Sequence, residues 1–240
     1  MKKRIVALIP ARGGSKGIIK KNLSLLKGRP LLAYAIEIGL ACNLIDRVIV
    51  STDDPEIAKV AKDFGAEVPF LRPNNIAQDD TPDRPVFVHL IHWLSEHENY
   101  NFDYLVNLRC TTPLKKLEHV EKAINLLSVG NFSSIRSMTK IDGKNHPYWC
   151  IKLNENQYAT PFIDGLDITK YHRRQLLPPA YAINGLVDIM KVDVILNHEK
   201  PYGDSMGILE TESIYGIDID SKYDLHLCEK ILDLVNPALS

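Results

Sequence analysis

The sequence predicts an α/β fold in which mostly parallel strands are joined by helices. From the N-terminus to Lys140, short apolar runs alternate with helix-compatible segments, which is the pattern of repeated strand–helix units. A glycine-rich, basic segment directly follows the first apolar run, and ligands of open α/β sheets gather at such carboxyl ends of strands. The chain of 240 residues is long enough for one large domain with a substantial core.

The expected elements follow from the period and length of the apolar runs. The strands of this first part are short, apolar and rich in β-branched residues: Arg4–Ile9, Arg47–Thr52, Tyr104–Leu108 and Ser133–Met138, with a brief extended segment at Val68–Leu71. The helices between them have amphipathic spacing: Leu31–Cys42, Pro55–Phe64, Val86–His97 and Leu117–Leu127.

The pattern changes after Lys140. Residues 141–183 are rich in turns, aromatic residues and charge, with one strand-like run at Tyr148–Leu153. We expect this segment to be an excursion from the core, an arm or lid, within a single domain spanning residues 1–240. Beyond it, Asn184–Val192 and Ile214–Asp220 are expected strands, and Lys222–Val235 is the expected closing helix.

Composition excludes several classes of protein. The 30 acidic residues nearly balance the 29 Lys and Arg residues, so the charge does not indicate a nucleic-acid binder. No apolar run approaches the length that spans a membrane. The four cysteines contain no Cys-x-x-Cys pair, which favours reduced thiols in a cytoplasmic protein over a disulfide framework or a zinc site.

The segment Ile9–Asn22 is the strongest indication of function. Three glycines allow a backbone to bend closely around a ligand, and four cations suit a polyanion such as a nucleoside triphosphate. The glycines are Gly13, Gly14 and Gly17, and the cations are Arg12, Lys16, Lys20 and Lys21. Neither the Walker P-loop nor the dinucleotide-binding spacing is present. The alternative interpretation is a solvated basic turn.

Further polar groups follow other expected strands. Arg109–Pro113 and Ser51–Asp54 each lie at a strand's carboxyl end, as does the pair Asp218 and Asp220. Two carboxylates spaced by two on a strand point to the same face, and beside a triphosphate they suit Mg²⁺. The alternative is an exposed strand end at which Asp220 caps the following helix.

Beyond these local features, Ile9–Leu23 closely resembles the signature of the acylneuraminate cytidylyltransferases, the CMP-sialic acid synthetases. Further segments match blocks of that family in the family's order, so the resemblance covers nearly the whole chain. These segments are Val48–Asp54, Leu71–Pro73, Thr111–Leu114, Arg174–Pro179, Asn184–Gly185 and Ile217–Asp220.

The resemblance implies a Rossmann-like, mostly parallel sheet with helices on both faces, as in nucleotide-diphospho-sugar transferases, plus a small excursion. It implies that CTP is joined to a nine-carbon α-keto sugar acid, with Mg²⁺ as cofactor and a homodimer in which the excursion reaches the partner's site. The implied nucleotide-binding residues are Ala11, Arg12, Gly13, Gly14, Ser15, Lys16, Lys21, Asn22 and Arg72. The implied sugar-binding residues are Arg109, Thr111, Thr112, Arg174, Gln175 and Asn184. The implied catalytic residues are Arg12, Lys21, Asp218 and Asp220, of which the two aspartates bind the metal.

Several positions depart from the family pattern, mostly in the expected sugar pocket. Arg109 stands where glutamine is usual, Ala182 replaces an arginine, and Asp188 lies where the usual run ends in tyrosine. The acceptor therefore stays open among neuraminate, legionaminate, pseudaminate and related acids. Arg109 either contacts a substrate oxygen or pairs with a nearby acid. Two alternatives to the main hypothesis stay open: a related sugar nucleotidyltransferase of the CMP-Kdo synthetase or guanylyltransferase type, and a non-catalytic nucleotide-binding homologue.

Overall fold

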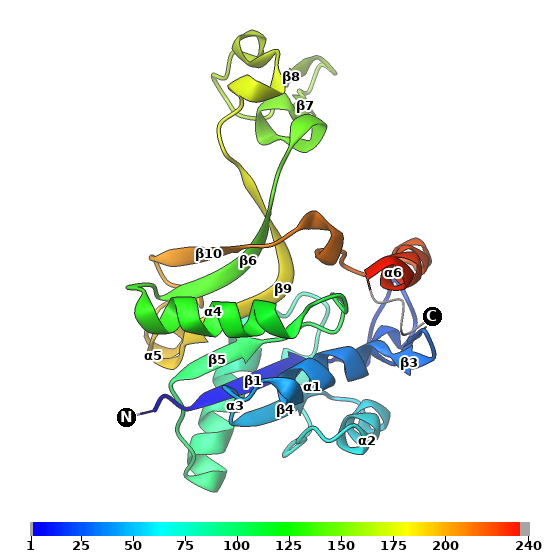
Figure 1. Ribbon diagram of the computed structural model, residues 1–240, viewed down its shortest axis with the longest axis vertical. Helices are drawn as coiled ribbons and strands as arrows, with labels where there is room; N and C mark the ends of the chain where they lie inside the picture. Colours follow the sequence, from blue (N-terminus) through cyan, green and yellow to red (C-terminus); the bar gives the residue numbers. More distant parts are fainter. Residues whose placement is uncertain (1, 236–240) are drawn as a thin grey trace.

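The computed structural model describes residues 2–235 and is built around one six-stranded sheet (Figure 1). The strand order is β10-β6-β9-β5-β1-β4. The strands of this sheet are β1 (Ile5–Pro10), β4 (Arg47–Ser51), β5 (Tyr104–Asn107), β6 (Ser134–Lys140), β9 (Tyr181–Lys191) and β10 (Met206–Glu210). There are also two small antiparallel pairs of strands. They are formed by β2 (Leu25–Leu26) with β3 (Arg29–Pro30) and by β7 (Ile151–Leu153) with β8 (Ala159–Pro161). The helices are α1 (Leu31–Ala41), α2 (Pro55–Asp63), α3 (Asp83–Glu98), α4 (Leu117–Val129), α5 (Val192–Asn197) and α6 (Lys222–Val235).

The sheet is mostly parallel and is covered on both faces, as the sequence predicts. β1 pairs in parallel with β4 and β5, and β10 pairs in parallel with β6. Alternate residues of β1 enter two cores: Ile5, Ala7 and Ile9 pack with α1 and α4, whereas Val6 and Leu8 pack with α3. Burial on both faces explains why this strand is a continuous apolar run.

β9 is the exception, because it runs antiparallel between β5 and β6. Its pairing with β6 has a register shift between Arg136 and Met138, and both strands continue out of the sheet towards the excursion. Residues 141–180 project away from the core (Figure 1) and contain the β7–β8 hairpin. The indole N–H of Trp149 donates to the carbonyl oxygen of Tyr171 at 2.6 Å and ties the two halves of this arm together.

One expected strand is wrong: Ile214–Asp220 begins in a 3-10 turn at Ser213–Tyr215 and continues as a segment that joins no sheet. The segment Val68–Leu71, expected to be extended, runs beside β4, with an isolated bridge from Glu67 to Ile49 before it and the Arg72 N–H donating to the Thr52 carbonyl oxygen after it. β10 and α5 were not predicted from the sequence. β10 is an edge strand with alternating burial, and a five-residue alternating run next to charged turns gives a weak signal.

Candidate active site

Two pockets open at the carboxyl ends of the central strands and share a wall made by Arg109 and Thr111. The first, the loop pocket, has a volume of about 430 Å³ and lies over the glycine-rich loop. The second, the β9 pocket, has a volume of about 470 Å³ and lies over β6 and β9. Their contact through a shared wall suits two ligands that react with each other.

The glycine-rich loop is held in place by its own polar groups. The N–H of Gly13 donates to Asp53 Oδ1 at 2.9 Å, and the side-chain amide of Asn22 donates to the carbonyl oxygen of Arg12 at 2.9 Å. A Cβ atom added to Gly17 would lie 2.4 Å from the carbonyl oxygen of Asp220, so only glycine permits this approach. The Gly13 N–H is therefore occupied internally, and the loop cations supply positive charge for an anion.

Three of the four loop cations enter the loop pocket. Arg12 Nη1 lies 2.6 Å from Asp79 Oδ1, and Lys16 pairs with the same carboxylate. Lys21 lies 2.7 Å from Asp220 Oδ1. Lys20 instead pairs with Glu56 outside the pocket. Each cation in the pocket is thus paired with a carboxylate that a polyanionic ligand would compete with.

Arg72 forms the buried side of the loop pocket. Its side chain donates to Ser51 Oγ at 3.0 Å and to the Ser51 carbonyl oxygen. Burial lowers the pKa of Arg72 to about 10; Asp53 opposes this shift and Arg12 adds to it. Because a guanidinium stays charged even when it is buried, Arg72 is a fixed hydrogen-bond donor for a polar group of a ligand.

The two aspartates are positioned by the main chain of the residue between them. The N–H of Ile219 donates to the carbonyl oxygen of Thr111 at 2.8 Å, and its carbonyl oxygen accepts from Lys21 Nζ at 2.9 Å. Ile219 is buried, whereas Asp218 and Asp220 are both exposed. Asp220 therefore lines the loop pocket and Asp218 lines the β9 pocket, and the segment that carries them belongs to no strand.

This donor set fits Mg²⁺. The described residues hold no cluster of three or more metal-ligating side chains, and Mg²⁺ typically takes one or two carboxylates with phosphate oxygens and waters. The alternative capping role is filled by Ser221, because its Oγ accepts from the N–H of Asp224 in the first turn of α6, while Asp224 accepts in return from the N–H of Ser221.

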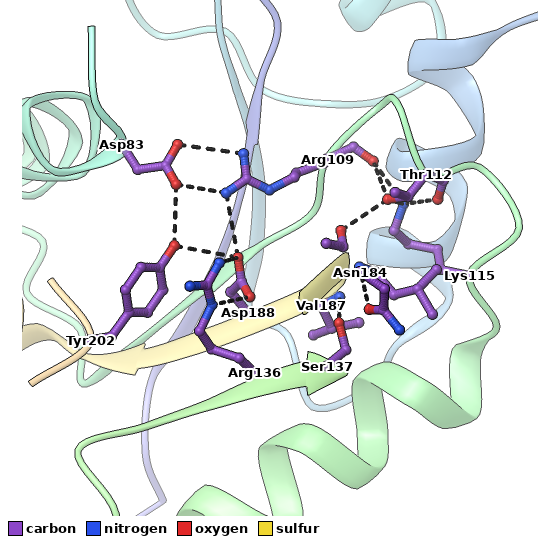
Figure 2. Close-up of polar contacts among 12 residues, drawn as sticks. Asp83, Arg109, Thr112, Lys115, Arg136, Ser137, Asn184, Val187, Asp188 and Tyr202 are labelled. Carbon is purple, nitrogen blue, oxygen red and sulfur yellow. Dashed lines mark hydrogen bonds and ion pairs between the residues drawn. The ribbon is translucent and has the colours of Figure 1, made fainter. Parts of the chain in front are cut away.

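Arg109 is held by acids in the wall between the pockets (Figure 2). Its Nη2 lies 2.6 Å from Asp83 Oδ2 and 3.5 Å from Asp188 Oδ2. Burial disfavours the charge, but Asp83 and Asp188 outweigh it and raise the pKa of Arg109. Internal pairing is therefore the interpretation that the geometry favours.

Lys115 supports the same loop from behind. Its Nζ donates to the carbonyl oxygens of Arg109, at 2.7 Å, and Thr112, at 2.5 Å. Its burial lowers the pKa of Lys115 to about 8.

Comparison with known proteins identifies the family of this chain. The family model described as cytidylyltransferase matches residues 6–236. The chain belongs to the cytidylyltransferase family. The predicted resemblance to the acylneuraminate branch is confirmed, and the chain is a nucleotidyltransferase.

The chain is similar to two named enzymes over nearly its whole length. The chain is 33% identical over 239 residues to a CMP-N,N'-diacetyllegionaminic acid synthase from Legionella pneumophila, covering 98% of this chain and 99% of the relative. It is 30% identical over 230 residues to an N-acylneuraminate cytidylyltransferase from Escherichia coli, covering 95% of this chain and 52% of the relative. A solved CMP-2-keto-3-deoxy-manno-octonic acid synthetase complexed with CTP has the same fold, with a TM-score of 0.71 at 19% identity over 96% of this chain and 99% of that one.

Most of the predicted site residues converge on these two pockets. The loop pocket is lined by Arg12, Ser15, Lys16, Lys21, Asn22, Arg72, Arg109, Thr111 and Asp220; the β9 pocket is lined by Arg109, Thr111, Asn184 and Asp218. The side-chain nitrogen of Asn184 bonds Thr139 and Thr211, so this amide shapes the pocket wall. Ala11 and Thr112 are buried, Gly13 is half-buried and Gly14 is exposed, and the four line neither pocket.

Two predicted sugar-binding residues lie elsewhere in the chain. Arg174 and Gln175 are exposed on the arm and line neither pocket. Conversely, the sequence analysis did not select Asp79, Asp83, Lys115, Arg136 or Tyr202. The acidic run from Gln78 to Asp83 was a signal for the first two, whereas nothing local marks the others.

Proposed function

We propose that this protein joins CTP to a nine-carbon α-keto sugar acid, giving the CMP-sugar and pyrophosphate, with Mg²⁺ as cofactor. The observation that carries the proposal is the convergence of Arg12, Lys16 and Lys21 with Asp220 in one pocket that adjoins a second pocket. The similarity to enzymes named for CMP-legionaminic and acylneuraminic acid synthesis supports this substrate class.

In the proposed reaction, the anomeric hydroxyl of the sugar acid attacks the α-phosphorus of CTP in line with the departing pyrophosphate. A new P–O bond forms to the sugar, the bond to pyrophosphate breaks, and the hydroxyl proton is released. Such transfer depends on positioning and on charge neutralisation. Arg12, Lys16 and Lys21 hold the triphosphate after Asp79 releases the first two of them, and Arg72 faces the nucleoside.

Asp218 and Asp220 would hold the metal at the junction of the pockets. When bound there, Mg²⁺ supplies charge neutralisation at the reacting phosphate and a lower pKa for the attacking hydroxyl. Asp218 lines the β9 pocket and Asp220 lines the loop pocket, and the main chain of Ile219 between them is fixed from both sides, by Thr111 and by Lys21.

The proposal includes a cytoplasmic location and assembly as a homodimer. Arg174 and Gln175 lie on the projecting arm, away from the pockets of their own chain, which favours a role at the partner's β9 pocket. The four cysteines are free thiols, as is usual in the cytoplasm. Among the described residues, no helix has the length and apolar character needed to cross a bilayer.

A screen tests the function directly. Pyrophosphate release is measured with each of four nucleoside triphosphates against N-acetylneuraminate, N,N'-diacetyllegionaminate, pseudaminate and Kdo, with Mg²⁺ or with EDTA. The proposal expects release only with CTP, Mg²⁺ and a nine-carbon acid. Preference for Kdo, or for another nucleotide, would favour the related nucleotidyltransferases, and binding without turnover would favour a non-catalytic homologue.

A further inference from the structure

Five segments that are distant in sequence meet around one guanidinium in the wall between the two pockets. Asp83 is the first residue of α3, Arg109 follows β5, Arg136 lies on β6, Asp188 lies on β9, and Tyr202 follows α5. Figure 2 shows the Arg109 guanidinium facing both aspartates, the Tyr202 hydroxyl between the two aspartates, and Arg136 beside Asp188.

We propose that Asp83 is a positioning residue for acceptor selection, which acts by fixing Arg109 in the shared wall of the loop and β9 pockets. The proposal rests on the proposed cytidylyl transfer, since it names how the acceptor side of that site is shaped.

The clamp around Arg109 has two carboxylates of different character. Asp83 is partly exposed and makes the shorter contact, 2.6 Å between Oδ2 and Arg109 Nη2. Asp188 is 1% exposed in its side chain and is shared, since Arg136 Nε lies 2.9 Å from its Oδ1. Tyr202 Oη lies 3.1 Å from Asp83 Oδ2 and 3.4 Å from Asp188 Oδ2. A buried carboxylate with this many donors holds its neighbours in one geometry.

The charges of the cluster cancel. Two guanidinium groups, of Arg109 and Arg136, face two carboxylates, of Asp83 and Asp188. The wall therefore presents fixed N–H donors with no net charge. Such a surface suits a neutral oxygen of the acceptor, a hydroxyl or an N-acyl carbonyl, and gives no excess attraction to the acceptor's carboxylate.

The opposite side of Arg109 is shaped to admit it. A Cβ atom at Gly185 would lie 3.2 Å from Arg109 Cδ, and Gly185 has a φ of +67°. The Arg109 side chain thus lies between Asp83 on α3 and Gly185 on β9. Removing the charge of Asp83 frees the guanidinium of Arg109 to move towards the acceptor.

Asp83→Asn tests this role, with Asp103→Asn as the matched control. Asp103 also pairs with one cation, Lys3, at 2.8 Å and is similarly exposed, but it lies at the amino end of the sheet. We expect Asp83→Asn to raise the acceptor KM about fivefold or more and to leave the CTP KM within about twofold. Asp103→Asn should change neither constant beyond about twofold.

A second measurement separates positioning from folding. The single variant Arg109→Gln leaves Asp83 and Asp188 facing each other without their shared cation. The double variant Asp83→Asn/Arg109→Gln restores zero net charge to the wall. The double variant should therefore lose less acceptor kcat/KM than the product of the two single losses.

The outcomes are distinct. A wild-type protein that releases no pyrophosphate with any acceptor overturns the proposed function, and the acceptor role with it. An active wild type whose Asp83→Asn variant changes both KM values equally, or whose two substitutions act independently, overturns the positioning role alone.

Discussion

The ammonium group of Lys21 donates a hydrogen bond of 2.9 Å to the carbonyl oxygen of Ile219, the residue between the two candidate metal ligands. The same ammonium lies 2.7 Å from Asp220 Oδ1. One cation from the first loop therefore fixes a carboxylate pair from the last loop, 198 residues away in sequence. This contact joins the loop proposed to bind the triphosphate to the aspartates proposed to bind the metal.

Lys21→Met removes both contacts and the charge offered to the triphosphate. We expect kcat/KM for CTP to fall by roughly 100-fold or more, since charge-assisted contacts to phosphate are strong and directional. Lys20→Met is the matched control, because Lys20 pairs with Glu56 outside the pocket. Its kcat/KM should stay within about threefold of wild type. Similar losses in the two variants would contradict the assignment.

Gly17→Ala separates the same two segments sterically. The new Cβ would lie 2.4 Å from the Asp220 carbonyl oxygen, whereas a Cβ at Gly14 meets nothing within 4 Å. We expect Gly17→Ala to lower turnover by about tenfold or more through displacement of Asp220, and Gly14→Ala to keep it. Steady-state rates with CTP and Mg²⁺ check this, and an active Gly17→Ala variant would show that the close approach is dispensable.

Asp79→Asn should strengthen CTP binding. The Asp79 carboxylate pairs with Arg12 and Lys16 in the place where the triphosphate is proposed to bind, so it competes with that ligand. Calorimetry should show a Kd for CTP lowered by about threefold to tenfold. Asp80→Asn, an exposed neighbour, is the control. Weaker binding to Asp79→Asn would instead make Asp79 part of the nucleotide site.

Lys115 makes stability depend on pH in a specific direction. Its pKa is lowered from 10.5 to about 8 in the folded protein, so between these values the unfolded chain binds more protons and the free energy of unfolding rises with pH. Lys115→Met lacks this titration. The difference in unfolding free energy, wild type minus Lys115→Met, should rise by up to roughly 3 kcal/mol from pH 8 to pH 10.5. Urea titrations at these pH values measure it, and a flat or falling difference would mean that folding does not lower the pKa of Lys115.

Complementation tests the proposed dimer. If the arm serves the partner's site, Asp220→Ala and Arg174→Ala are each inactive alone, but a mixed dimer contains one site with both native residues. Mixing the two after dissociation should restore up to about a quarter of wild-type activity. Activity that stays at the level of the parents would place Arg174 outside the partner's site.

The sequence was sufficient for the features that depend on local pattern. The strands around Val6, Val48 and Val106 are apolar because both faces of the central sheet are buried, and the loop after the first of them carries its own glycines and cations. The aspartate pair was predicted to end a strand, but it lies in a segment that joins no sheet, where two main-chain hydrogen bonds of Ile219 hold it in place.

Contacts between distant segments were not predictable. The pairing of Arg109 with Asp83 depends on how the start of α3 meets the end of β5, and no periodicity encodes that meeting. The same is true of Asp79, whose partners lie on the first loop. Charged residues in turns normally indicate solvent exposure, and only the assembled fold shows which of them face one another.

The most direct test of the central claim is one assay of pyrophosphate release with CTP and Mg²⁺, with and without N,N'-diacetyllegionaminate. The account predicts that pyrophosphate and the CMP-sugar form in equal amounts when the acid is present and that no pyrophosphate is released without it. A correctly folded Asp220→Ala variant should form neither product. Release that does not depend on the acid, or an Asp220→Ala variant with undiminished activity, would contradict it.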